Sequence, residues 1–126
     1  MKINLKKDFS IKTLIFVFIL VLIIILIFSG IDYLIHLLKE EYSVPDYYFP
    51  HKIIYGTIIG FITYFFIRKQ KPAIKALIFS ATISILLQIN YYLQGYPKDF
   101  VFLFLGIHFV ILFVLSLIAF NLIKNL

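Results

Sequence analysis

Four long apolar runs occupy most of this chain, and they constrain its fold more than any other feature. They cover approximately residues 14–28, 53–67, 76–93 and 100–123. A helix needs roughly 20 apolar residues to cross a bilayer core about 30 Å thick. Backbone inside hydrocarbon must satisfy its own hydrogen bonds, which favours helices. We therefore predict an all-α, polytopic membrane protein with four transmembrane helices in an up-down-up-down antiparallel bundle.

With their flanking residues, the four spans are expected at approximately 11–38, 51–68, 73–94 and 99–124. Asp8 or Ser10 can cap the first helix. The second span reaches full length only if Lys52 and Arg68 extend to the two interfaces. Only short segments, the longest about a dozen residues, connect these expected spans, so residues 1–126 are expected to form a single transmembrane domain with no soluble domain.

The cationic residues predict the orientation. Nine of the 12 Lys and Arg residues lie with the two termini and the 68–75 turn, while Lys39, Lys52 and Lys98 lie on the other side. We therefore expect a protein integral to the cell membrane. The positive-inside rule predicts that both of its termini lie in the cytoplasm. The net charge of +6 suits contact with the anionic headgroups of the lipid bilayer, whereas nucleic acid is not an expected partner.

Several absences narrow the chemistry. The chain has no cysteine, which excludes disulfides and thiolate metal sites. It also lacks the phosphate-binding, nucleophile-elbow and dinucleotide-binding motifs, so an enzyme is not favoured and no cofactor is required. No Asp or Glu lies in the middle of an expected span, which argues against a carboxylate-driven antiporter.

Small residues predict where helices pack closely. Gly56 and Gly60 form a GxxxG pair, which allows close approach of a further helix and suggests a homo-oligomer. Ser80 and Ser84 belong to a row of small and polar residues along the third span. Plain helix packing is the simpler interpretation of this row, and a polar pathway is the alternative.

Polar residues gather toward the predicted outer side, which holds all three histidines and all but one of the nine tyrosines. Counting 1.5 Å of rise per residue places His108 roughly 12 Å below the outer boundary. Gln88 and Thr57 lie at similar depth on two other spans. His108 can therefore join helices through a bond to Gln88 or Thr57, or it can bind a ligand, relay protons or hold a metal.

The leading hypothesis is an outward-facing polar and aromatic pocket that binds or passes a small solute, an ion or a lipid. Its expected lining residues are His108, Gln88, Thr57, Asn90, Tyr92 and Tyr55. A cavity that joins His108 to the outer surface would favour this hypothesis.

Two alternatives remain open. The first is a membrane-embedded redox protein or enzyme that uses a metal or a quinone, with Asp32, His36, His51 and His108 as candidate metal ligands or proton relay. Their spacing matches no closed metal motif, and a solvated interfacial position is the simpler expectation for Asp32, His36 and His51, which lie at span ends. The second alternative is a non-catalytic scaffold subunit of a membrane complex, which a closed, hydrogen-bonded His108 would favour.

Overall fold

The computed structural model describes residues 10–123, and this range is all-helical with no strand. The four long helices within it are α2 (Ile11–His36), α3 (Tyr48–Ile67), α4 (Pro72–Leu93) and α5 (Lys98–Leu122). All four are long and apolar enough to cross a membrane. A short 3-10 turn, η1 (Glu40–Tyr42), lies between α2 and α3. The predicted all-α class with four membrane-length helices is confirmed.

The helix ends follow local sequence signals. The Ser10 hydroxyl accepts a hydrogen bond from the Thr13 amide at 3.2 Å and caps α2, while Asp8 lies outside the described residues. Pro72 occupies the first turn of α4, where its missing N–H costs nothing. Gly95 follows α4 with φ of +93°, a left-handed conformation that glycine adopts without strain. The largest boundary difference inside the described range is at α3, which begins at Tyr48 rather than at residue 51.

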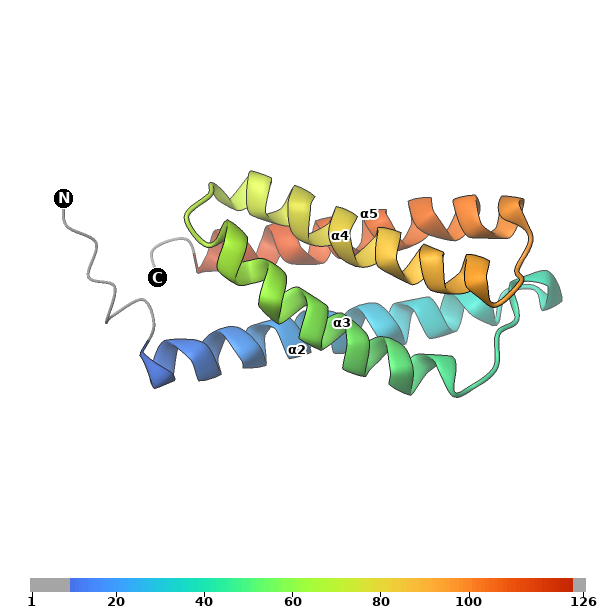
Figure 1. Cartoon of the computed structure of the whole chain (residues 1–126), viewed down its shortest axis with the longest axis horizontal. Coiled ribbons are helices and arrows are strands. Elements are labelled where there is room, and N and C mark those ends of the chain that lie inside the picture. Colours follow the sequence, from blue (N-terminus) through green and yellow to red (C-terminus); the bar gives the residue numbers. More distant parts are fainter. Residues whose placement is uncertain (1–9, 124–126) are drawn as a thin grey trace.

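The chain reverses direction at each connection, and α3 crosses the bundle obliquely (Figure 1). Contacts between helices join α4 with α5, α2 with α3 and α5, and α3 with α4. The α2–α3 and α4–α5 connections lie together at one end of the bundle, which we call the paired-loop end (Figure 1). The α3–α4 connection, the start of α2 and the end of α5 lie at the opposite end.

Apolar side chains fill the centre of the bundle and also cover its outside. Phe28, Phe79 and Phe120 are fully buried in one hydrophobic cluster with branched residues of α2, α4 and α5. Large apolar side chains such as Ile19 and Ile23 nevertheless remain exposed on the outer face of α2, and every other long helix shows the same pattern. Such a surface suits lipid rather than water, which supports placement in a membrane.

The two glycines of the GxxxG pair pack inside the chain. A Cβ atom on Gly60 would lie 2.9 Å from side-chain atoms of both Phe79 and Val21, and one on Gly56 would lie 3.2 Å from Ile25. The missing side chains therefore let α3 approach α2 and α4. Because these glycines already have neighbours within the chain, they no longer argue for a homo-oligomer.

The serines of α4 are buried and hydrogen-bonded within their own helix. Ser80 Oγ donates to the Ala76 carbonyl oxygen at 2.6 Å, and Ser84 Oγ donates to the Ser80 carbonyl oxygen at 2.6 Å. Neither hydroxyl is available to guide a solute along the helix in this arrangement. The part of the row formed by Ser80 and Ser84 thus behaves as a packing surface.

We predict that Ser84→Ala changes the free energy of unfolding by less than about 1 kcal/mol. The hydroxyl donates to the Ser80 carbonyl oxygen, which the helix backbone already uses as an acceptor, so the variant leaves no acceptor unpaired. The measurement is the unfolding midpoint in increasing dodecyl sulfate, with wild type alongside. A loss well above this value would show that the hydroxyl has a partner on another helix.

Candidate functional site

Six buried polar side chains from all four long helices meet toward the paired-loop end. We call them the polar cluster: Asp32 and His36 of α2, Lys52 of α3, Gln88 and Tyr91 of α4, and His108 of α5. Asp32 and His108 are 0% exposed, and Lys52 is 4% exposed. Ionisable groups are expensive to place within a membrane bundle, so their convergence marks this region as the candidate site.

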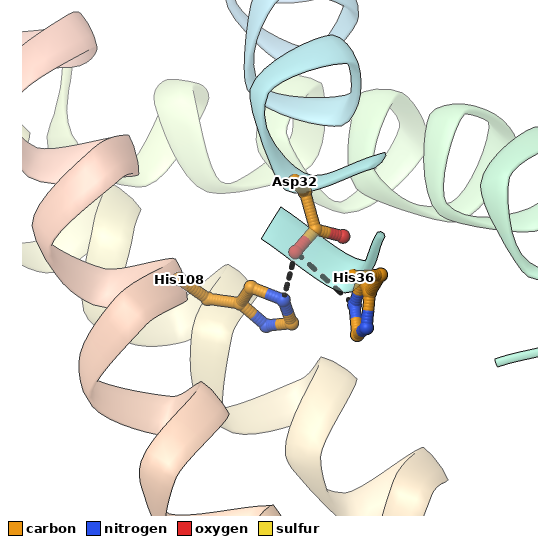
Figure 2. A group of neighbouring side chains, drawn as sticks. All are labelled: Asp32, His36 and His108. Carbon is orange, nitrogen blue, oxygen red and sulfur yellow. Dashed lines mark hydrogen bonds and ion pairs between the residues drawn. The ribbon is translucent and has the colours of Figure 1, made fainter. Parts of the chain in front are cut away.

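Asp32 lies at the centre of the polar cluster. Its Oδ1 accepts a hydrogen bond from His108 Nε2 at 2.8 Å and lies 3.3 Å from His36 Nε2 (Figure 2). The Lys52 ammonium forms an ion pair with Oδ2 of the same carboxylate. Because the two opposite charges are buried together, each compensates the desolvation of the other.

The partners of His108 determine its tautomer. A carboxylate oxygen accepts hydrogen bonds, so the Nε2–H of His108 is the group that donates to Asp32. The other ring nitrogen, Nδ1, then accepts from the Gln88 amide nitrogen, which lies 2.6 Å away. Gln88 Oε1 is buried without a hydrogen-bond partner among the described residues. His108 is therefore a neutral imidazole that links α2, α4 and α5.

His36 carries its proton on the other ring nitrogen. Its Nδ1 lies 2.5 Å from the Tyr42 carbonyl oxygen, which can only accept, so Nδ1–H donates. The lone pair of Nε2 then points into the polar cluster, where the Tyr91 hydroxyl at 3.2 Å and the Lys52 ammonium at 3.3 Å can donate to it.

Aromatic rings close the polar cluster at the paired-loop end. Tyr48, Tyr91, Phe100 and Phe104 form a separate buried cluster, which we call the aromatic cap. The His36 ring stacks on Phe104 with centroids 4.2 Å apart and planes only 6° apart. Part of the tyrosine excess at this end therefore covers a buried charged group and does not form a membrane-interface belt.

A cavity of about 510 Å³ lies between α3 and α4, beside the polar cluster. Two members of the polar cluster, Lys52 and Tyr91, also line this cavity, which we call the α3–α4 pocket. Further polar lining comes from Tyr47, His51, Tyr55, Asn90 and Gln94. Apolar lining comes from Ile59, Ile83, Leu86 and Leu87. The polar residues lie at the start of α3 and the end of α4, so the pocket is polar near the paired-loop end and apolar deeper in the bundle.

The expected pocket residues fall into different places. Asn90 and Tyr55 line the α3–α4 pocket, and Gln88 belongs to the polar cluster. Thr57 is buried, but its hydroxyl has no partner among the described residues and does not bond His108. Tyr92 is 57% exposed and faces a different groove, which α4 and α5 line.

His108 does not line the α3–α4 pocket, because both ring nitrogens are bonded and the ring is enclosed. It bonds Gln88, the first of the two partners considered from the sequence. A closed His108 is the arrangement expected of a structural histidine. A ligand in the pocket would not touch His108, which Asp32 and Lys52 connect to the pocket lining.

The prediction that Asp32, His36 and Lys52 lie at a solvated membrane interface is wrong, because all three side chains are buried. The connection after α2 folds back and places Tyr42 and the aromatic cap over His36, which excludes the solvent that a span end would otherwise meet. His51, by contrast, is exposed and lies outside the polar cluster, where its ring contacts Tyr47 and Tyr55.

Sequence reasoning missed Lys52 and Tyr91 as members of the site. One signal for Lys52 was present: Asp32 is near the end of α2 and Lys52 is near the start of α3, so two opposite charges lie toward the same end of two consecutive helices. Tyr91 gave no such signal, since the neighbouring Tyr92 is equally polar and faces elsewhere.

These features define a four-helix membrane protein with a charge-balanced polar cluster inside its bundle. Comparisons with protein-family models, curated proteins and solved structures find no match for this chain.

Proposed function

We propose that this small integral membrane protein binds a phospholipid in the α3–α4 pocket. The observation that carries the proposal is the gradient along the pocket, from tyrosine, histidine and amide side chains near the paired-loop end to branched apolar side chains deeper in the bundle. A phospholipid has the same order of polarity along its length. Its headgroup would lie at the level of Tyr47 and Gln94, and an acyl chain would extend past Ile59.

The chemistry of the polar end supports an acceptor-rich headgroup. Tyrosine hydroxyls and the Asn90 and Gln94 amides can all donate hydrogen bonds to phosphate or ester oxygens. The Lys52 ammonium has three N–H groups, of which Asp32 and His36 accept two, so one remains for a group in the pocket. Since Asp32 already balances the positive charge of Lys52, the ammonium acts as a positioned hydrogen-bond donor and not as an unpaired cation.

The pocket opens toward the outer leaflet in this proposal. With Lys52 inside the bundle, Lys39 and Lys98 are the only Lys or Arg residues in or next to the connections at the paired-loop end. The positive-inside rule favours this end as the outer one, so in this proposal both termini lie on the cytoplasmic side of the cell membrane.

Filling the pocket tests the proposal. We predict that Ile59→Trp reduces the phospholipid that co-purifies with the protein in mild detergent by at least half, because the indole occupies the apolar part of the pocket. Ile58→Trp is the matched control: Ile58 is the adjacent residue of α3, is 50% exposed and does not line the pocket. The measurement is moles of each lipid class per mole of protein by mass spectrometry.

Equal lipid content in the two tryptophan variants would contradict lipid binding in the α3–α4 pocket. The closed, hydrogen-bonded His108 would then favour the second candidate, a scaffold subunit whose polar cluster only joins helices. In that case a fixed protein partner should co-purify from the native membrane at constant stoichiometry.

A further inference from the structure

The polar cluster contains three side chains of the kind that bind transition metals. One ligand atom each from Asp32, His36 and His108 lies within 4.8 Å of the other two, and all three residues are buried. The three side chains point toward one another from α2 and α5 (Figure 2). Four-coordinate ligands about 2.1 Å from one ion are roughly 3.4 Å apart, so small side-chain rotations would bring this set to a metal-binding geometry.

The hydrogen bonds around His36 already suit metal binding. A metal-bound imidazole usually donates its other N–H to a carbonyl or carboxylate, which fixes the ring and its tautomer. His36 Nδ1–H donates to the Tyr42 carbonyl oxygen, so the Nε2 lone pair faces the polar cluster. Stacking on Phe104 holds the ring in that orientation.

His108 needs one rearrangement, and Gln88 can accommodate it. To bind a metal through Nε2, His108 must carry its proton on Nδ1. Rotation of the Gln88 amide by half a turn would bring Oε1 to that proton. Gln88 Oε1 is buried and has no partner among the described residues, so the rotation would satisfy an acceptor that is otherwise unpaired. Ser29 lies one turn before Asp32 on α2, and its buried hydroxyl also has no hydrogen-bond partner among the described residues.

Lys52 occupies the position of the cation in this arrangement. Its ammonium contacts the Asp32 carboxylate and His36 Nε2, which are two of the three ligand groups. Lys52 also lines the α3–α4 pocket, so its side chain has space into which it can withdraw. An incoming ion would take over the charge compensation of Asp32 that Lys52 provides.

From this geometry we infer that Asp32, His36 and His108 form a binding site for a divalent transition metal of the zinc class, in which the Lys52 ammonium replaces the ion when the ion is absent. Two imidazoles and one carboxylate suit Zn²⁺, Co²⁺ or Fe²⁺ and leave at least one coordination position for another ligand. His51 takes no part. The inference does not depend on lipid binding, since every group it uses except Lys52 lies outside the pocket.

The test is a titration of the purified, chelator-treated full chain in detergent with Co²⁺, followed by displacement with Zn²⁺. Wild type should bind one Co²⁺ with visible d–d absorption. Lys52→Met should bind Co²⁺ at least tenfold more tightly, because the competing ammonium is gone. Asp32→Asn and His108→Ala should each weaken binding at least tenfold.

His51→Ala is the matched control, because it removes an exposed histidine of the same end without touching the polar cluster. It should leave Co²⁺ affinity unchanged. Ile59→Trp should still bind one Co²⁺, which separates this inference from lipid binding. Absence of saturable Co²⁺ binding to wild type would overturn the inference. Equal Co²⁺ affinity in wild type, Asp32→Asn and His108→Ala would overturn it as well. Because the first of these outcomes uses wild type alone, it decides the question even if a variant does not fold.

Discussion

Lys52→Met, measured with a chelator present, is expected to lower the free energy of unfolding by about 3–5 kcal/mol, the usual cost of leaving a buried charge without its partner. Asp32 is 0% exposed, and Lys52 provides the only opposite formal charge within the polar cluster. The methionine fills a similar volume, so the loss comes from the uncompensated carboxylate and not from a cavity. The measurement is the unfolding midpoint in increasing dodecyl sulfate.

The double variant Asp32→Asn/Lys52→Met separates charge from packing. The asparagine side chain has no charge but keeps an oxygen that can accept the hydrogen bond from His108 Nε2. We expect the double variant to recover most of the stability that either single variant loses, because a buried ion pair is often replaceable by neutral groups. Lys71→Met, at an exposed lysine before α4, serves as the control and should change little. Additive losses in the double variant would show that the ion pair is not the source of the effect.

Gly60→Leu is expected to disrupt the bundle. Even a Cβ atom at this position would lie 2.9 Å from Phe79 and from Val21, both of which are buried on neighbouring helices. A ring edge and a β-branched side chain inside a packed core cannot easily move away. Gly60→Ala alone should cost about 1–3 kcal/mol, the usual range for overpacking, and the larger leucine should prevent α3 from docking.

Gly106→Ala is the matched control for Gly60→Ala. Gly106 also lies within a long helix, but a Cβ atom there would have no neighbour within 4 Å among residues 10–123. Alanine favours helix over glycine by roughly 0.5–1 kcal/mol in water, so this variant should be as stable as wild type or slightly more stable. Circular dichroism and the unfolding midpoint of the two alanine variants provide the comparison. Similar behaviour of the two would contradict the close approach of α2, α3 and α4.

Depth counting along the sequence succeeded for some residues of the site and failed for others. It placed His108 and Gln88 at similar depth, and their side chains are hydrogen-bonded. The sequence placed Asp32 and His36 at the end of a span, although both lie in the same polar cluster as His108. Counting assumes that helices are parallel and that each begins at the same boundary. Here α3 crosses obliquely, and the segment after α2 folds back over its end, so the assumption fails (Figure 1).

The sequence by itself determined the four helices, because hydropathy over some twenty residues and the hydrogen-bonding needs of backbone in lipid act locally along the chain. It also determined that polar chemistry gathers at one end. Only the tertiary structure decided which polar groups meet. The long helices are apolar on nearly every face, so periodicity could not tell which face is buried. The pairing of Asp32 with Lys52 and the enclosure of His108 arise from the packing of α3 against its neighbours, which depends on residues far apart in sequence.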